Sequence, residues 1–348
     1  MSGGGGPARG AVRAIVTLPP YASFAEEVAR HPLFAGFRLN TVMPLAEETP
    51  RGALARLARL GPPLWVDLKG RQLRVVEAAV PPFTAVRVSH RLRVPTPCDV
   101  FFADGREAAR LVAVDGDRLL LEEGPRRVVG PGESVNVVHP GLEVEGTLTD
   151  GDRAYLAAMR DLGLTKAMLS FVEREEDVAE LREALPGVEP MLKVESRRGL
   201  AFAGRNGARL GRLVAARGDL YVEVREPHRI VGALRDVIAA DPDAVVASRL
   251  FPSLSRTPVP VAAEVCDAAF LLALGYRTFL LGDEVCLRRE PLLAALASGR
   301  AFTLRALLAA ALLALLVVVL PRLQSWPVAI LGLLACAGVL GGYERVRE

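Results

Sequence analysis

Short apolar runs alternate with amphipathic stretches from Val12 onward, and this alternation is the main structural signal in the chain. Eight of the runs have the length and composition of buried strands: Ala14–Leu18, Phe37–Asn40, Leu64–Lys69, Ala167–Phe171, Met191–Glu195, Leu213–Ala216, Ala244–Ser248 and Thr278–Leu281. Stretches with helical spacing lie between most of them, among them Phe24–Arg30, Arg51–Leu60, Glu176–Leu185 and Val261–Leu274. Eight strands, each followed by a helix or an insertion, predict a parallel (β/α)8 barrel of the α/β class.

The connection after the third strand is too long for a single helix and has the pattern of β structure. Val, Leu and Phe alternate with polar residues from Arg74 to about Glu145. The pairs Asp104-Gly105 and Asp115-Gly116 are typical of hairpin turns. We therefore predict a small β-barrel domain at residues 74–145, inserted into a (β/α)8 barrel at residues 11–73 and 146–300. The Gly-rich residues 1–10 are predicted to be disordered.

The residues after the barrel are far more apolar than the rest of the chain. Ala306–Leu320 contains only Ala, Leu and Val, and Pro327–Gly342 is nearly as apolar, with the turn Pro321–Ser325 between them. Neither run has the polar face that a soluble helix normally keeps. We therefore predict a hairpin of two transmembrane helices within residues 301–343, in contact with membrane lipid. The alternative is a buried helical hairpin that closes the barrel.

Arginines beside the two apolar runs predict how the hairpin is oriented. Arg322 alone lies in the turn, whereas four arginines flank the pair: Arg300, Arg305, Arg345 and Arg347. The positive-inside rule then places both ends of the hairpin in the cytoplasm. The expected protein is membrane-anchored, with a cytoplasmic catalytic domain and a short cytoplasmic tail at residues 344–348.

Composition and charge exclude several classes of protein. The chain has 348 residues, and its 43 Lys and Arg against 40 Asp and Glu give a net charge of +3. No basic stretch is interleaved with aromatic residues, so we expect no nucleic-acid partner. The four cysteines form no CxxC pair and the four histidines show no ligand spacing. These patterns argue against a disulfide framework and against a zinc site.

The strongest candidate chemistry lies at the ends of two neighbouring predicted strands. Lys193 and Glu195 are two residues apart and therefore point to the same face of a strand. Asp219 follows the apolar run Leu213–Ala216 at the point where a strand would end. Only three basic residues in this Arg-rich chain are lysines, which suggests that Lys193 supplies a compact ammonium. The pattern predicts a divalent metal beside a cation for an anionic substrate, and the alternative is a chance Lys–Glu pair.

Other predicted strands also end in polar residues. In a (β/α)8 barrel the chemistry lies at the carboxyl ends of the strands. The polar residues at the remaining ends are Arg38, Asn40, Asp67, Lys69, Ser170, Arg217, Ser248 and Glu284. Taken singly, most of them are as consistent with surface charges, ordinary strand ends or a helix cap as with a site.

With these motifs in place, the chain from about Val12 to Leu296 resembles the pyruvate kinase family. The pair Lys193-Val194-Glu195 and Ala216-Arg217-Gly218-Asp219-Leu220, in this order and spacing, carries most of the resemblance. Shorter matches support it: Phe37–Asn40, Val66–Gly70 with Arg74, Ala103–Gly105, Ser170–Val172, Ala247-Ser248, Pro260–Glu264 and Leu280–Glu284. The resemblance implies a glycolytic kinase, a transferase that moves phosphate from phosphoenolpyruvate to ADP.

The same resemblance implies the roles of the candidate residues. Glu195 and Asp219 would hold Mg²⁺ or Mn²⁺ against the substrate, as carboxylates suit a hard ion. Lys193 would lie against the transferring phosphoryl group and offset its charge. The other implied groups are phosphate-binding Arg38 and Arg74, carboxylate-binding backbone N–H groups at Ala216, Arg217 and Gly218, a monovalent-cation (K⁺) site at Asn40 and Asp67, and Ser248 near the proton delivered to the enolate.

The departures from the family pattern fall mainly on the nucleotide side. Val42 stands within Asn40–Pro44 where the family has a hydroxyl ligand of the monovalent cation, so the resemblance does not extend to potassium dependence. Glu133 stands near the place of a lysine that meets nucleotide phosphates, and a carboxylate there would repel ADP or ATP. Tyr221 replaces a glycine, and the apolar hairpin stands where the family has a regulatory domain.

Three functions are therefore open from the sequence. The first is a shortened, membrane-tethered pyruvate kinase, which the retained Lys193 and Arg74 favour. The second is a membrane-anchored sensor that binds phosphoenolpyruvate or pyruvate without turnover, and the third is a magnesium-dependent lyase that uses a pyruvate enolate. The altered nucleotide side favours the second and third. Homo-oligomer formation stays open as well.

Overall fold

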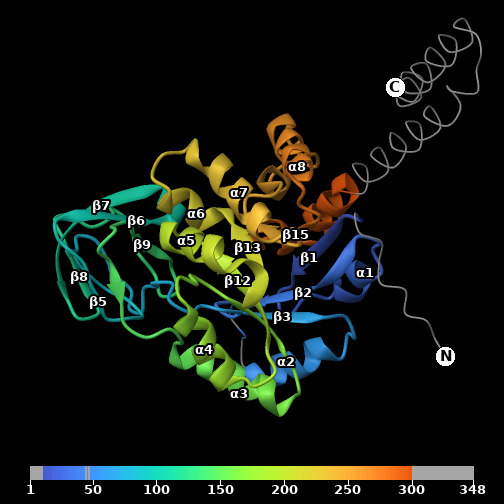
Figure 1. Cartoon of the computed structure of the whole chain (residues 1–348), viewed down its shortest axis with the longest axis horizontal. Coiled ribbons are helices and arrows are strands. Elements are labelled where there is room, and N and C mark those ends of the chain that lie inside the picture. The colour runs from blue at the N-terminus through green and yellow to red at the C-terminus, as the bar shows by residue number, and fades with distance from the viewer. Residues whose placement is uncertain (1–10, 44, 46–47, 300–348) are drawn as a thin grey trace, which may run out of the picture. The chain divides into compact units, whose positions relative to one another are not determined.

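Eight parallel strands form a closed barrel at the centre of the protein. The computed structural model describes residues 11–43, 45 and 48–299. Around the barrel the strand order is β1-β15-β14-β13-β12-β11-β3-β2. Figure 1 labels β1, β2, β3, β12, β13 and β15 among these strands. Their bounds are β1 Arg13–Thr17, β2 Phe34–Asn40, β3 Leu64–Leu68, β11 Lys166–Leu169, β12 Glu189–Val194, β13 Arg212–Ala216, β14 Val245–Ala247 and β15 Thr278–Leu281. All eight predicted strands are therefore confirmed, and so is the predicted parallel barrel.

Helices follow most of the barrel strands, as the amphipathic stretches predict. The α-helices are α1 Ala25–Ala29, α2 Pro50–Ala58, α3 Asp150–Asp161, α4 Glu175–Ala184, α5 Arg197–Asn206, α6 Arg217–Glu223, α7 Arg229–Ala240, α8 Ala262–Leu274 and α9 Asp283–Cys286. Three short 3₁₀ helices are η1 Ala103–Gly105, η2 Gly207–Arg209 and η3 Pro252–Ser255, and residues 289–299 are helical as well. Local signals begin some of these helices: Thr149 and Asp152 form a capping box at α3, and Thr49 caps α2 ahead of Pro50.

The interior of the barrel changes from apolar to polar within two residues along several strands. An apolar cluster of buried side chains fills its middle: Ile15, Met168, Met191, Val214, Val245, Ala247 and Leu280. Two residues further along their strands, on the same face, lie Thr17, Ser170 and Lys193, all buried. Asp67 follows the partly buried Trp65 in the same way. The barrel core thus ends in a layer of buried polar side chains at the carboxyl ends of the strands.

The long connection between β3 and α3 forms antiparallel sheets. One sheet has the order β4-β8-β7-β6-β9, and a second pairs β10 with β5. The strands are β4 Ala85–Arg87, β5 Leu92–Arg93, β6 Cys98–Phe102, β7 Glu107–Asp115, β8 Arg118–Leu121, β9 Val135–Val137 and β10 Glu143–Val144. Buried side chains such as Val100, Phe102 and Leu111 form a separate core here.

The five-stranded sheet is linked at both edges to the chain that leaves the barrel. Arg74 bridges to Ser134, beside β9, and Val75 bridges to Val88, beside β4. The segment at residues 74–75 therefore lies between the two edge strands and covers the backbone groups that edge strands would otherwise expose. We refer to residues 74–145 as the inserted domain; these bounds are those predicted from the sequence.

Contacts divide the chain into two units, Met1–Leu296 and Ala297–Glu348, so the barrel and the inserted domain belong to one unit. Among the helices in the described part of the chain, none is both long and apolar enough to cross a membrane. The predicted hairpin at residues 301–343, the tail at 344–348 and the disordered segment at 1–10 lie outside the described residues.

Candidate active site

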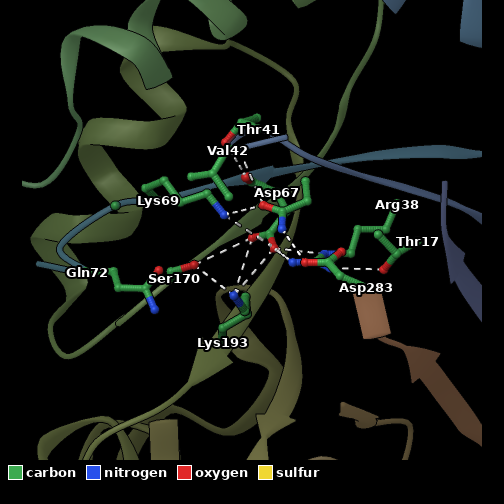
Figure 2. A network of polar contacts seen from close by, with 12 residues as sticks. Thr17, Arg38, Thr41, Val42, Asp67, Lys69, Gln72, Ser170, Lys193 and Asp283 are labelled. Carbon is green, nitrogen blue, oxygen red and sulfur yellow. Dashed lines mark hydrogen bonds and ion pairs between the residues drawn. The ribbon is translucent and has the colours of Figure 1, made fainter. Parts of the chain in front are cut away.

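Asp67, at the end of β3, is the centre of the buried polar layer (Figure 2). Its Oδ2 accepts a hydrogen bond from Nε of Arg38 at 2.8 Å and another from Nη2 of the same guanidinium. Its Oδ1 lies 3.4 Å from Nζ of Lys193. Burial alone would raise the pKa of Asp67, but Lys193, Lys69 and Arg38 outweigh it and hold that pKa well below its usual range. Asp67 is therefore a permanent anion that fixes three cations around it.

Arg38, at the end of β2, is held from several sides. Besides Asp67, its Nη1 donates to Oγ1 of Thr17 at 2.9 Å and to Oδ1 of Asp283 at 3.3 Å. Burial works against the charged form, but Asp67 and Asp283 outweigh it and raise the pKa of Arg38. Since these acceptors restrain the guanidinium, Arg38 is preorganised for an anionic ligand.

Lys193, near the end of β12, links two carboxylates and a hydroxyl. Its Nζ donates to Oγ of Ser170 at 2.8 Å and lies 3.1 Å from Oε1 of Glu195. Burial favours the neutral amine, yet Asp67 and Glu195 prevail and raise the pKa of Lys193. Lys193 therefore stays charged at neutral pH although its side chain is nearly inaccessible to water.

Lys69 occupies the position predicted for a monovalent cation. Its Nζ donates to Oδ1 of Asn40 at 2.7 Å and lies 3.9 Å from Oδ2 of Asp67. The amide of Asn40 in turn donates to Oδ2 of Asp283 at 2.6 Å. Burial, together with the nearby Arg74 and Lys193, lowers the pKa of Lys69 to about 7 despite the attraction of Asp67. The amino group of Lys69, which is partly charged at neutral pH, thus already lies between Asn40 and Asp67.

The turn after Lys69 is fixed by a helix N-terminus and by a close approach of two backbones. The carboxylate of Asp152 accepts from the backbone N–H groups of Lys69 at 2.8 Å and Gly70 at 3.0 Å. Gly70 has φ of +51°, and a Cβ there would lie 2.5 Å from the carbonyl oxygen of Ser170. Only glycine fits this position, which explains the glycine after Lys69.

Glu195 and Asp219 are the carboxylates predicted to hold the metal. Oε2 of Glu195 accepts from the backbone N–H of Phe171 at 2.8 Å. The two oxygens of Asp219 accept from Nε2 of Gln72 at 3.0 Å and Nδ2 of Asn136 at 3.1 Å. Burial and the charge of Glu195 raise the pKa of Asp219 to about 6. Two carboxylates that repel each other fit a divalent cation between them.

Glu195 and Asp219 would supply only part of a metal's coordination. In the described part of the chain, no group of three or more His, Cys, Asp or Glu residues is placed to hold a metal ion. Mg²⁺ usually keeps several waters and binds one or two carboxylates plus substrate oxygens. The donor set therefore fits a magnesium ion shared with a ligand better than a metal enclosed by protein.

Arg74 reaches the site from the start of the inserted domain. Its Nε and Nη2 donate to Oε1 of Gln72 at 3.0 and 2.6 Å, and its Nη1 donates to the carbonyl of Gly132. Burial lowers the pKa of Arg74. Gln72 thus connects Arg74 to Asp219, a role that the sequence analysis did not assign to it.

The turn after β13 combines predicted binding groups with a structural arginine. Helix α6 begins at Arg217, as the resemblance implies. The side chain of Arg217, however, donates to both oxygens of Asp267 at 2.7 and 2.8 Å and to the carbonyl of Ser248. A Cβ on Gly218 would lie 3.5 Å from Oγ of Ser248. Ser248 itself has φ of +67°.

A cavity of about 870 Å³ joins most of the predicted residues. Its lining includes Arg38, Asn40, Lys69, Arg74, Lys193, Glu195, Gly218, Asp219, Ser248 and Glu284. Asp67, Ser170, Ala216 and Arg217 are absent from this lining, and all four are buried. Most of the predicted residues thus line the cavity, and Asp67 acts beneath it.

Several residues of the site were not predicted from the sequence, notably Thr17, Gln72, Asn136 and Asp283. Asp283 lies two residues after the end of β15 at Leu281, so its position just after a strand was a usable signal. Asn136 offered none, because it lies on β9 and meets Asp219 only through the packing of the inserted domain against the barrel.

Two residues that depart from the family pattern, Val42 and Tyr221, line the cavity. The guanidinium of Arg249 lies 4.3 Å from the centre of the Tyr221 ring, and both residues line the cavity. Glu133 does not line it: Nη1 of Arg127 donates to Oε2 of Glu133 at 2.9 Å, and this arginine lowers the pKa of Glu133. Its negative charge is therefore compensated locally, which reduces the predicted repulsion of a nucleotide.

Several curated proteins similar to this chain are pyruvate kinases. A comparison with models of protein families finds no match. A pyruvate kinase of Agrobacterium vitis is 29% identical over 199 residues, which cover 56% of this chain and 41% of that protein. One from Methylorubrum extorquens is 28% identical over 308 residues (78% and 63%), and one from Chlamydia pneumoniae is 25% identical over 260 residues (70% and 53%).

The chain spans about half the length of these curated relatives. The similarity to several pyruvate kinases over up to 78% of the chain, together with a closed parallel barrel that carries the Lys193–Glu195 and Asp219 motifs at its strand ends, is consistent with a divergent pyruvate kinase-like protein.

Proposed function

We propose that this protein transfers a phosphoryl group from phosphoenolpyruvate to ADP at a magnesium site. The observation that carries the proposal is one cavity in which Lys193, Arg38 and Arg74 surround the carboxylates of Glu195 and Asp219. Such a set combines cations for a phosphorylated carboxylate with oxygen ligands for a hard metal ion. The curated relatives with which the chain was compared above are pyruvate kinases.

In the proposed reaction, the bond between the phosphorus and the enol oxygen breaks and a bond to an oxygen of ADP forms. Arg38 orients the phosphate, because Asp67, Thr17 and Asp283 hold its guanidinium in one place. The ammonium of Lys193 offsets the charge that develops on the phosphoryl group and the enolate. Mg²⁺ held by Glu195 and Asp219 would neutralise ligand oxygens when bound. The enolate then takes a proton on carbon, with Ser248 nearby, to give pyruvate.

A coupled assay of pyruvate formation tests the proposal. With saturating phosphoenolpyruvate, ADP and Mg²⁺, we expect turnover that depends on the metal. The double variant Glu195→Gln/Asp219→Asn keeps the shape of both side chains and should abolish turnover and metal-dependent oxalate binding. Unchanged oxalate affinity of the double variant in calorimetry would show that these carboxylates do not hold the metal.

A second candidate is a sensor that binds the same ligand without turnover. The pair of Arg249 and Tyr221 favours it, because Tyr221 departs from the family pattern and both residues line the cavity. Oxalate binding with Mn²⁺ or Mg²⁺ but no pyruvate formation would support the sensor and contradict the kinase. Mg²⁺-dependent release of pyruvate by cleavage of a carbon–carbon bond, in an assay without phosphoenolpyruvate and ADP, would instead support the lyase alternative.

We also propose that residues 301–343 anchor the protein in a membrane, with the catalytic domain on the cytoplasmic side. The proposal depends on the sequence alone, since the apolar runs have no polar face to offer water. Cells expressing the full chain and a chain that ends at Arg300 should be fractionated. We expect the full chain in the carbonate-washed membrane and the short chain in solution with its ligand site intact. A full chain that stays soluble, or a short chain that aggregates, would favour a buried helical hairpin.

A further inference from the structure

A second cavity, of about 440 Å³, lies behind one wall of the catalytic cavity. The segment Arg71–Arg74 separates the two, because Gln72 and Arg74 line the catalytic cavity while Arg71 and Leu73 line the second one. Successive side chains of an extended segment point to opposite sides, so residues 71 and 73 face one cavity and residues 72 and 74 face the other. The second cavity therefore lies between the inserted domain and the loops after β11, β12 and β13, and none of the cations proposed for phosphoryl transfer lines it.

One side of the second cavity is apolar. The inserted domain contributes buried side chains, among them Val135, Val137, Leu142 and Val144. Phe171, from the turn after β11, adds an aromatic ring to the lining. Such a surface favours an uncharged organic group over bulk water.

The other side is strongly cationic. Four arginines line it: Arg71, Arg197, Arg198 and Arg225. Only two carboxylates accompany them. Oε2 of Glu173 forms an ion pair with Nη2 of Arg198 at 3.0 Å, and Oε1 of Glu173 accepts a hydrogen bond from Oγ of Ser196 at 2.5 Å. Burial raises the pKa of Glu223 to about 8, so this carboxyl group is largely uncharged at neutral pH. Positive charge in the lining thus exceeds negative charge.

Arg71 is the buried arginine of this lining whose positive charge is compensated least by the protein. Its side chain is 6% exposed, and its one ion pair with a described residue is a 3.5 Å contact to Oδ1 of Asp177. That oxygen also accepts from Thr147 at 2.9 Å and from Arg174 at 3.1 Å. Nε of Arg71 has no hydrogen-bond partner in the described part of the chain. A buried guanidinium with so little compensation is expected to attract an anion.

We propose that the second cavity is a binding site for a small organic anion. Its anionic group, a phosphate or a carboxylate, lies among Arg71, Arg197 and Arg198, and its apolar body lies against Val135 and Leu142. An adjoining crevice of about 600 Å³ shares Arg71, Arg198 and Leu142 with the cavity, so a ligand longer than one ring fits as well. The site goes beyond the proposed function because it does not require catalysis or metal binding.

Calorimetric titration of the full chain with phenyl phosphate tests the site, since this probe combines an anionic group with an aromatic body. Arg197 suits charge reversal: its side chain is exposed and makes no hydrogen bond or ion pair with a described residue. We expect one bound phenyl phosphate per chain and about a tenfold weaker affinity in Arg197→Glu, from the Coulomb energy of one reversed charge near the ligand. Ala201→Trp, four residues along α5 and also in the lining, should fill the cavity and abolish binding.

Two control variants separate this site from the catalytic cavity and from a general effect of charge on α5. Arg205→Glu reverses an exposed charge on the same helix but outside the lining and should leave affinity unchanged. Arg74→Gln removes a cation of the catalytic cavity and should also leave it unchanged. Inorganic phosphate should bind more weakly than phenyl phosphate, because it lacks the apolar body. No binding of phenyl phosphate, equal affinity in Arg197→Glu and Arg205→Glu, or a loss confined to Arg74→Gln would overturn the proposal.

Discussion

The floor and the rim of the cavity that contains Lys193, Glu195 and Asp219 both carry many charges, but only the charges of the floor are buried. The floor, formed by the ends of the barrel strands, holds Arg38, Asp67, Lys193 and Glu195, each at most 9% exposed. The rim holds Arg106 from the inserted domain and Arg256 from the loop after β14, and both are exposed. Within the described part of the chain, neither rim side chain makes a hydrogen bond or an ion pair. The floor thus has fixed charges, and the rim has charges in water.

The difference shows why only the floor can be preorganised for chemistry. Buried opposite charges interact strongly because little water screens them, and each one restrains its neighbours. Exposed arginines lose most of that interaction to solvent and salt, so they attract ligands without orienting them. Residues of the floor should therefore affect turnover, whereas residues of the rim should affect mainly the encounter with an anionic ligand.

The largest effect is expected for Lys193→Met, which removes the cation between Asp67 and Glu195. If the protein is a kinase, we expect kcat to fall about a hundred- to a thousandfold and KM to change much less, because the charge acts mostly in the transition state. Steady-state pyruvate formation measures both constants. Lys166→Met is the matched control, since Lys166 forms a more exposed pair with Glu189 outside the cavity. A fall in kcat matched by an equally large rise in KM would mark Lys193 as a binding residue and weaken the contrast with the rim.

An intermediate effect, on how the stability of the fold depends on pH, is expected for Glu223. Glu223 is a buried carboxyl group that forms no ion pair with a described residue. In the floor, each buried charge has a partner of opposite charge. Glu223 has none among the described residues, so it shows what burial does to a carboxyl group without such a partner. Burial raises its pKa from 4.5 to about 8, so between these values the unfolded chain releases its proton first and the stability of the fold decreases as pH rises. Glu223→Gln should remove this decrease, which amounts to a few kcal/mol at about 1.4 kcal/mol per pKa unit.

Urea unfolding at pH 5 and pH 9 measures this difference between the parent chain and Glu223→Gln. The variant should gain stability relative to the parent at pH 9 and little at pH 5. Asn136, which donates to Glu223 at 3.3 Å, can make the same hydrogen bond to a glutamine oxygen. An identical change with pH in both chains would mean that Glu223 keeps a normal pKa in spite of its burial.

The smallest effect is expected for Arg106→Ala on the rim. Here we expect at most about a threefold increase in KM for an anionic substrate and an unchanged kcat, since one exposed charge contributes about 1 kcal/mol or less. The increase should vanish at high salt, where exposed charges are screened. Kinetics at two ionic strengths measure it. A loss of kcat comparable to that of Lys193→Met would remove the distinction between floor and rim.

The sequence predicted the barrel because its strands carry a local signal. A buried parallel strand appears as a short apolar run, and all eight runs are strands of the closed barrel. The candidate site followed from the same logic: the carboxyl ends of parallel strands meet at one end of the barrel, so polar residues at those ends come together. Lys193 and Glu195 needed only the two-residue period of a strand.

Tertiary structure alone decided how these residues are charged and held. Asn40 and Asp283 are 243 residues apart, and Asn136 and Asp219 are 83 residues apart, yet each pair is joined by a hydrogen bond. No local pattern encodes such pairs, because they arise only when the barrel closes and the inserted domain packs on it. The lowered pKa of Lys69 and the raised pKa of Glu223 depend on burial, which is a property of that packing. The sequence thus determined which groups reach the end of the barrel, and their surroundings in the fold determined their protonation and their partners.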